Sequence, residues 1–141
     1  MTRVDFHFNA DNRLQHCCRL IRKIYRAGQK VVVFDDDAAQ LARLNQTLWT
    51  FSPLDFIPHV MATAADASRT PVLLASEPVE FPHHDVLVNL STSPPEFFSR
   101  FERLIEVVGT DDGDREQARG RWRFYKERGY PIATHDLTAA K

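Results

Sequence analysis

Positively charged and aromatic side chains recur at helical spacing in residues 111–130. One face of the predicted helix carries most of them, and its members are Arg115, Arg119, Trp122 and Lys126, with Arg123 beside them. Guanidinium groups bind carboxylates through paired hydrogen bonds, and an aromatic ring packs against an apolar side chain. The pattern is typical of a binding site for an acidic ligand that also carries an apolar group. The alternative is a solvated amphipathic helix whose rings pack on the core.

The boundaries of this helix follow from the residues that flank it. Asp112 or Asp114 is expected to cap the first turn, where a carboxylate also interacts favourably with the helix dipole. Gly129 is expected to end the helix in the left-handed conformation, and Pro131 cannot continue it. Residues 133–141 are then expected to form a loose tail.

A second candidate for chemistry is the acidic triplet Asp35, Asp36 and Asp37, which follows an apolar run at residues 30–34. Carboxylates at the end of a buried strand would suit a metal-dependent phosphoesterase of the α/β class. Phosphatases with an aspartate nucleophile have Asp-x-Asp followed by a β-branched residue, whereas Ala38 follows here. Capping of the next helix is therefore the simpler interpretation of the triplet.

Metal and cofactor sites are not predicted elsewhere in the sequence. Cys17 and Cys18 point about 100° apart on a predicted helix, and no other cysteine completes a set of ligands. We expect both to be buried helix residues. His83 and His84 are expected to lie on a surface loop. Residues 9–12, after the first predicted strand, lack the glycines of a dinucleotide site. We therefore assign no catalytic residue, no metal site and no cofactor.

Composition restricts the possible partners and the cellular compartment. The chain has 141 residues and a formal net charge of −1, so affinity for a polyanion must come from a local patch. Its two cysteines are adjacent and cannot form a normal disulfide, which favours a reducing, cytoplasmic environment. There is no apolar run long enough to span a bilayer and no signal peptide, so no contact with a membrane is expected.

Strand and helix patterns alternate through most of the chain. The predicted strands cover residues 4–8, 30–34, 71–75 and 85–90. The predicted helices cover residues 12–28, 38–48, 94–108 and 111–130. We expect one three-layer α/β/α domain over residues 1–141, with a mainly parallel, or mixed, sheet. It would be Rossmann-like without a glycine-rich nucleotide loop.

An aromatic segment connects the second predicted helix to the rest of the chain. Residues 48–59 hold two prolines and three large aromatic side chains, so they cannot be regular structure throughout. Trp49 and Phe56 either cover the core or stay partly exposed as anchors of a protein interface.

In order and spacing, five segments together resemble the chi subunit family of bacterial DNA polymerase III holoenzyme. They are Phe6-His7-Phe8, residues 28–33, Leu48-Trp49 with Phe56-Ile57-Pro58-His59, residues 85–90, and residues 118–130. The resemblance spans almost the whole chain. It implies a non-catalytic accessory subunit of the clamp-loader complex in DNA replication.

The resemblance also implies two protein-binding surfaces. Trp49 and Phe56 match positions that face the psi subunit or, in some bacteria, an XPD-like helicase. Other positions of the family bind the acidic C-terminal tail of single-stranded DNA-binding protein, and this tail ends in Pro-Phe. The matching residues here are Arg115, Arg119, Trp122 and Arg123. Lys126 lies on the same face of the helix. The family often has tyrosine and lysine at positions 122 and 123. Nucleic acid would then be reached mostly indirectly.

Two other functions stay open at this point. One is a phosphoesterase at Asp35, Asp36 and Asp37. The other is a direct nucleic-acid binder that uses the C-terminal basic helix, against which the net charge near zero argues.

Overall fold

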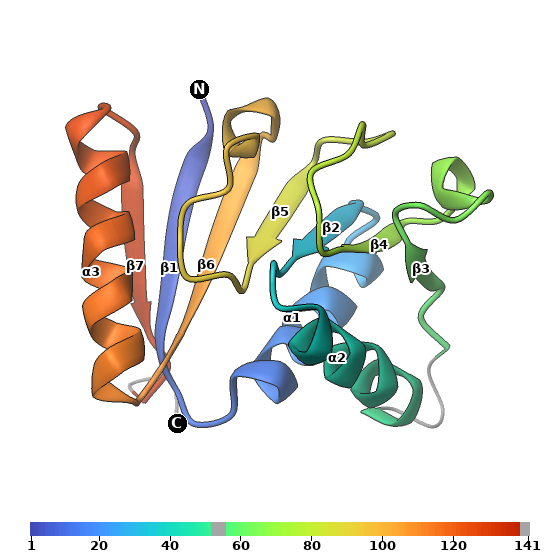
Figure 1. The fold of residues 1–141 in the computed structure, drawn as a ribbon, viewed down its shortest axis with the longest axis horizontal. Coiled ribbons are helices and arrows are strands. Elements are labelled where there is room, and N and C mark those ends of the chain that lie inside the picture. Colours follow the sequence, from blue (N-terminus) through green and yellow to red (C-terminus); the bar gives the residue numbers. More distant parts are fainter. Residues whose placement is uncertain (52–55, 139–141) are drawn as a thin grey trace.

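The computed structural model describes residues 1–51 and 56–138. In these residues one seven-stranded parallel sheet has the order β3-β4-β2-β5-β6-β1-β7, and three α-helices pack on it (Figure 1). The strands are β1 Arg3–Ala10, β2 Val31–Phe34, β3 His59–Met61, β4 Val72–Ala75, β5 Val86–Asn89, β6 Arg103–Gly109 and β7 Ile132–Asp136. The helices are α1 Arg13–Arg26, α2 Ala38–Phe51 and α3 Asp112–Glu127, with 3-10 turns at Ala67–Arg69 (η1) and Phe98–Arg100 (η2). The expected α/β/α fold is confirmed.

The sheet separates two apolar cores because neighbouring strand residues point to opposite faces. On β2, Val31 and Val33 pack with α1 and α2, whereas Val32 and Phe34 pack with α3 and the segment around η2. Helices therefore cover both faces, and a strand that is buried on both sides reads as an unbroken apolar run. In Figure 1, α3 lies at the β7 end of the sheet and α2 lies toward the β3 end.

The first two helices begin as the sequence indicates. The Asn12 side chain accepts a hydrogen bond from the Gln15 backbone N–H at 3.1 Å and caps α1. On α1, Cys17 and Cys18 are both free and buried, as expected. The Asp37 carboxylate accepts from the backbone N–H groups of Ala39 and Gln40 at 3.1 and 3.2 Å, so this member of the acidic triplet caps α2.

The predicted helix at residues 94–108 is wrong. The spacing of Phe97, Phe98 and Phe101 with Leu104 and later residues imitates a helical face, but the chain forms only the turn η2 and then strand β6. Strand β6 lies between β5 and β1, and its residues 104–108 are buried on both faces of the sheet. Burial on both sides produces an apolar run whose spacing does not distinguish a strand from a helix.

The expectation of a loose tail over residues 133–141 is wrong for residues 133–136. They belong to β7, which pairs in parallel with β1 from Val4 opposite Ile132 to Phe8 opposite Asp136. The Leu137 backbone N–H continues the ladder by donating to the Phe8 carbonyl at 3.0 Å. Strand β7 is mostly exposed, so it lacks the apolar pattern of the inner strands. Residues 139–141 lie outside the described part of the chain.

Candidate protein-binding surfaces

The N-cap of helix α3 lies one residue before the first of the two candidates that the sequence suggests. Asp111, rather than Asp112 or Asp114, is the N-cap, and its carboxylate accepts from the Asp114 backbone N–H at 3.1 Å. The Asp114 carboxylate instead turns back and accepts from the Gly109 backbone N–H at 2.6 Å, which fixes the end of β6 against the helix. At the other end Gly129 has a φ of +80°, the left-handed conformation expected of it.

A buried charged network fixes the inner face of α3 on the sheet. Arg121 is 2% exposed, and its Nε donates at 2.9 Å to Glu106 of β6, which is 0% exposed. The Tyr125 hydroxyl donates to the same carboxylate at 2.6 Å, and Asn89 donates to it from β5 at 3.0 Å. Burial, followed by the Glu106 charge, raises the pKa of Tyr125 well above its usual range. Tyr125 is therefore a fixed core residue and not part of an exposed aromatic face.

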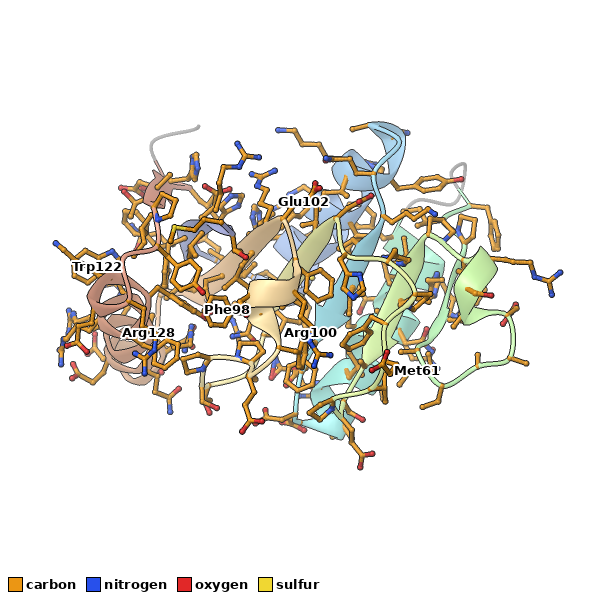
Figure 2. The ribbon with its side chains drawn as sticks, turned by 90° about the horizontal axis from the view of Figure 1, so that it is seen from above. Met61, Phe98, Arg100, Glu102, Trp122 and Arg128 are labelled. Atoms are coloured by element: carbon orange, nitrogen blue, oxygen red, sulfur yellow. The ribbon has the colours of Figure 1, made fainter. Side chains whose placement is uncertain are left out.

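The side of α3 that carries Arg115, Arg119 and Trp122 forms one wall of a groove of about 350 Å³, called here the α3 groove. The opposite wall and floor come from β1, β6 and β7. The lining residues are Phe6, Phe8, Asn9, Val108, Arg115, Ala118, Arg119, Trp122 and Thr134. The floor is mainly apolar, and the two guanidinium groups come from successive turns of the helix. Figure 2 shows Trp122 at the α3 end of the molecule.

Three of the five predicted basic-helix residues line this groove. Arg115 donates to the Asn9 side-chain oxygen at 2.8 Å, while Arg119 forms an exposed ion pair with Glu116 at 2.8 Å. Trp122 is partly buried beside them. Arg123 and Lys126 are exposed and are absent from the described lining residues. The Lys126 ammonium instead lies 4.5 Å from the Trp122 ring centroid, so it contacts the indole from outside the groove.

The groove also uses residues that the sequence analysis missed. Phe8 and Asn9 stand at the end of β1, and Thr134 comes from β7. Asn9 has a φ of 65° and donates to the Asp136 carboxylate at 2.9 Å, so one side chain links β7 to Arg115. The sequence held one signal for this position, because asparagine adopts the left-handed conformation more readily than most residues and Asn9 follows a predicted strand. The pairing of β1 with β7 depends on contacts across the whole chain and left no local pattern.

The second predicted surface, the aromatic patch, is formed by Trp49 and Phe56. Trp49 is 53% exposed and Phe56 is 68% exposed, with their ring centroids 5.7 Å apart. Beneath them the His59 ring lies 4.5 Å from the Trp49 ring. Met61 is also exposed on β3. Residues 52–55, between the two rings in sequence, lie outside the described part of the chain.

Three other residues of the same motif are less exposed than the two rings. Leu48 and His59 are buried, and Pro58 is half-buried. The His59 ring Nδ1 lies 2.7 Å from the Ile57 carbonyl, which holds the imidazole in place. An exposed pair of rings on a fixed base is the arrangement expected of interface anchors, because association removes their surface from water at little cost in ordering.

The remaining candidates for chemistry differ in their exposure. Asp35 is buried at the end of β2, while Asp36 and Asp37 are exposed, and Asp37 caps α2. Over residues 1–51 and 56–138, no group of three or more His, Cys, Asp or Glu side chains is placed to hold a metal ion. His83 is buried, so the expectation of two surface histidines holds only for His84.

Comparison with known proteins identifies the family. The profile described as DNA polymerase III chi subunit, HolC, matches residues 1–133. The chain belongs to the DNA polymerase III chi subunit family. The DNA polymerase III subunit chi of Pseudomonas aeruginosa is 40% identical over 141 residues, which cover 97% of this chain and 98% of the relative. This confirms the resemblance found in the sequence.

More distant relatives carry the same description. The DNA polymerase III subunit chi of Haemophilus influenzae is 29% identical over 85% of this chain and 84% of its own length. The corresponding subunit of Escherichia coli is 27% identical over 85% of this chain and 82% of its own length. The family places the chain in DNA replication as a subunit of DNA polymerase III. Among the described helices, none is both long and apolar enough to cross a membrane.

Proposed function

We propose that this chain is a non-catalytic accessory subunit of the clamp-loader complex. It would bridge the acidic C-terminal tail of single-stranded DNA-binding protein to a second protein, which is the psi subunit or an XPD-like helicase. The α3 groove carries the proposal, since it places Arg115, Arg119 and Trp122 around one apolar floor. These are the side chains that an acidic peptide ending in phenylalanine requires.

The proposed binding mode assigns a role to each wall of the groove. The terminal carboxylate of the tail would pair with Arg119, which must leave its exposed partner Glu116, or with Arg115. The terminal phenylalanine would pack on Phe8 and beside the Trp122 indole. Upstream acidic residues of the tail would meet Arg123 and Lys126 on the outer surface of α3. Exchange of one exposed ion pair for another costs little, so Glu116 does not block the site.

The second surface is proposed on the aromatic patch. Trp49 and Phe56 would be buried by the psi subunit or the helicase, while Leu48, Pro58 and His59 keep the patch in shape. The two surfaces lie toward opposite ends of the sheet, as the positions of Trp122 and Met61 in Figure 2 illustrate. Both partners could therefore bind at once, which is what a bridging subunit requires.

The tail model is tested by titration with a peptide of the acidic tail that ends in Pro-Phe and a free carboxylate. We expect affinity on the order of micromolar, because a short peptide covers little area and must be ordered. A rise in salt should weaken binding. Removal of the terminal phenylalanine should abolish most of the affinity. Equal binding of the full and shortened peptides would contradict the groove model and leave a nonspecific basic surface.

A separate titration addresses the nucleic-acid alternative. Single-stranded and duplex DNA are added to the isolated protein without single-stranded DNA-binding protein. The proposal predicts weak binding to both, because the net charge is only −1 and the basic residues form one narrow face. The matched variants are Arg119→Ala on α3 and Arg69→Ala, an exposed arginine of η1. If DNA bound as tightly as the peptide, and if only Arg119→Ala lost this binding, the protein would be a direct nucleic-acid binder.

A further inference from the structure

A larger cavity than the α3 groove opens at the carboxyl edge of the parallel strands. This carboxyl-edge cleft has a volume of about 680 Å³. Its walls are the ends of β1, β2, β5 and β6 and the first turns of all three described helices. In Figure 1 these ends lie along the same edge of the sheet. The function proposed above uses none of its residues.

Carboxylates outnumber basic groups around the cleft. The basic residues that line it are Arg13 and Arg43, and the carboxylates are Asp11, Asp35, Asp36, Asp37, Asp111 and Asp114. The Arg13 guanidinium is already engaged, since it donates to the Leu90 carbonyl at 2.9 Å and the Val107 carbonyl at 3.2 Å. It also lies 3.6 Å from Asp114. The cleft is therefore acidic, and its one inward-bound arginine serves the ends of β5 and β6.

Asp35 supplies an independent sign that the cleft accepts a ligand. The residue is 1% exposed, and its Oδ1 accepts from the Asp37 backbone N–H at 2.9 Å. Its Oδ2 is buried and has no hydrogen-bond partner within the described residues. Buried carboxylate oxygens are normally paired, so an unpaired one that lines a cleft is an acceptor without its donor.

The electrostatic surroundings of Asp35 favour a positively charged donor. Burial raises the pKa of Asp35 to about 6, against a lowering by the Asp37 backbone N–H. The Asp37 and Asp36 carboxylates also raise this pKa and the Arg13 charge lowers it, and the value of about 6 includes all of these effects. A cation next to Oδ2 would relieve the repulsion among these carboxylates. A metal ion is a poor candidate, because no three suitable ligands converge in the described residues.

We propose that the carboxyl-edge cleft binds a basic segment of a protein partner, with an arginine or lysine of that segment donating to Asp35 Oδ2. The distribution of charge favours a segment over a single small cation. Asp35 lies buried at the end of β2, Asp36 is exposed beside it, and Asp111 is exposed beyond β6. One side chain can reach the buried oxygen while flanking basic residues face the exposed carboxylates. The α3 groove would then select an acidic segment and this cleft a basic one.

The proposal is tested with a capped peptide of three arginines separated by glycines, titrated into the full-length ¹⁵N-labelled protein. Backbone amide shifts should change at residues 35–37, 91–92 and 113, which line the cleft. Asp35→Asn should weaken binding by about tenfold or more, because a charged acceptor becomes neutral. Asp36→Asn should also weaken it, and its exposed position keeps the fold intact. The matched control is Asp66→Asn, which changes an exposed carboxylate outside the cleft and should bind like the wild type.

Three results would overturn the proposal. The first is equal loss of binding in Asp36→Asn and Asp66→Asn, which would indicate a general charge effect. The second is equally tight binding of spermidine with the same shifts, which would make the cleft a site for small cations. The third is a set of shifts confined to residues outside the cleft. Failure of the acidic tail peptide to bind would leave this proposal standing, since the two sites select opposite charges.

Discussion

At the β7 end of the sheet the chain builds a concave groove with two arginines, whereas toward the β3 end it exposes a pair of aromatic rings. The groove is held by a buried ion pair and by a strand from the end of the chain. The aromatic patch instead rests on the buried His59 ring, which lies against Trp49. Charges that point into a groove suit a short, charged peptide. Exposed rings on a fixed base suit the surface of a folded protein.

The largest expected difference between the two ends of the sheet is how far their stability depends on a buried charge. Arg121→Met leaves Glu106 buried without its ionic partner, so unfolding free energy should fall by about 3–5 kcal/mol. The double variant Glu106→Gln, Arg121→Met should recover much of that loss, since it removes the unpaired charge as well. Urea unfolding monitored by circular dichroism measures both. If Arg121→Met were as stable as the wild type, the network would not be what fixes α3.

The aromatic patch should respond in binding and not in stability. Trp49→Ala should weaken binding to psi or the helicase by about 2 kcal/mol or more and leave the fold intact, because the ring is half-exposed. Its neighbour Leu48 is 4% exposed, so Leu48→Ala should instead destabilise the protein by about 2–5 kcal/mol. Calorimetric titration and thermal unfolding separate the two effects. Early melting of Trp49→Ala with unchanged partner binding would place Trp49 in the core and not at an interface.

Within the basic helix, position relative to the groove should matter more than charge. Arg119→Ala should weaken binding of the acidic tail by about tenfold, because a guanidinium can hold a carboxylate through two hydrogen bonds. Lys126→Ala should weaken it by only about twofold, since an exposed ammonium outside the groove adds a weak interaction. Fluorescence anisotropy with a labelled peptide measures both affinities. An equal loss of affinity in Arg119→Ala and Lys126→Ala would indicate that the peptide is attracted to the whole basic face and makes no specific contact in the groove.

The smallest expected effect is a pH dependence confined to the β7 end. His7 on β1 lies between His16 on α1 and His135 on β7, with Asp5 and Arg103 nearby. Burial, followed by repulsion from His16 and His135, lowers the pKa of His7 from 6.5 to about 4. The unfolded chain therefore binds more protons than the folded protein between these values. Stability from this site is fully present above pH 6.5 and is lost as the pH falls toward about 4.

Hydrogen exchange at about pH 5 and pH 7 measures this effect strand by strand. Amides of β7 should lose protection at the lower pH before those of β4, because His135 of β7 packs directly on His7. His7→Gln should reduce the difference, while His84→Gln, which changes an exposed histidine, should leave it unchanged. Equal loss of protection across the whole sheet would contradict a local effect of the histidines.

The sequence predicted the features that depend on local periodicity. Arg115, Arg119 and Trp122 repeat at helical spacing on a helix with clear end signals, so three groove residues could be named together. Features that depend on pairing across the chain were missed. The residues of strand β6 match a helical pattern because both faces of the strand are buried, and those of β7 match a loose tail because neither of its faces is well buried. Phe8, Asn9 and Thr134 could therefore not be assigned to the groove.

The most direct test of two separate surfaces is amide chemical-shift mapping with the acidic tail peptide. We expect the amide chemical shifts of Asn9, Thr134 and residues 115–122, which surround the α3 groove, to change when the peptide binds. The shifts of Trp49 and Phe56 should not change. The Trp49→Ala variant should give the same shifts as the wild type, because the aromatic patch takes no part in tail binding. Shifts centred on Trp49 and Phe56, or spread evenly over all basic residues, would contradict this expectation.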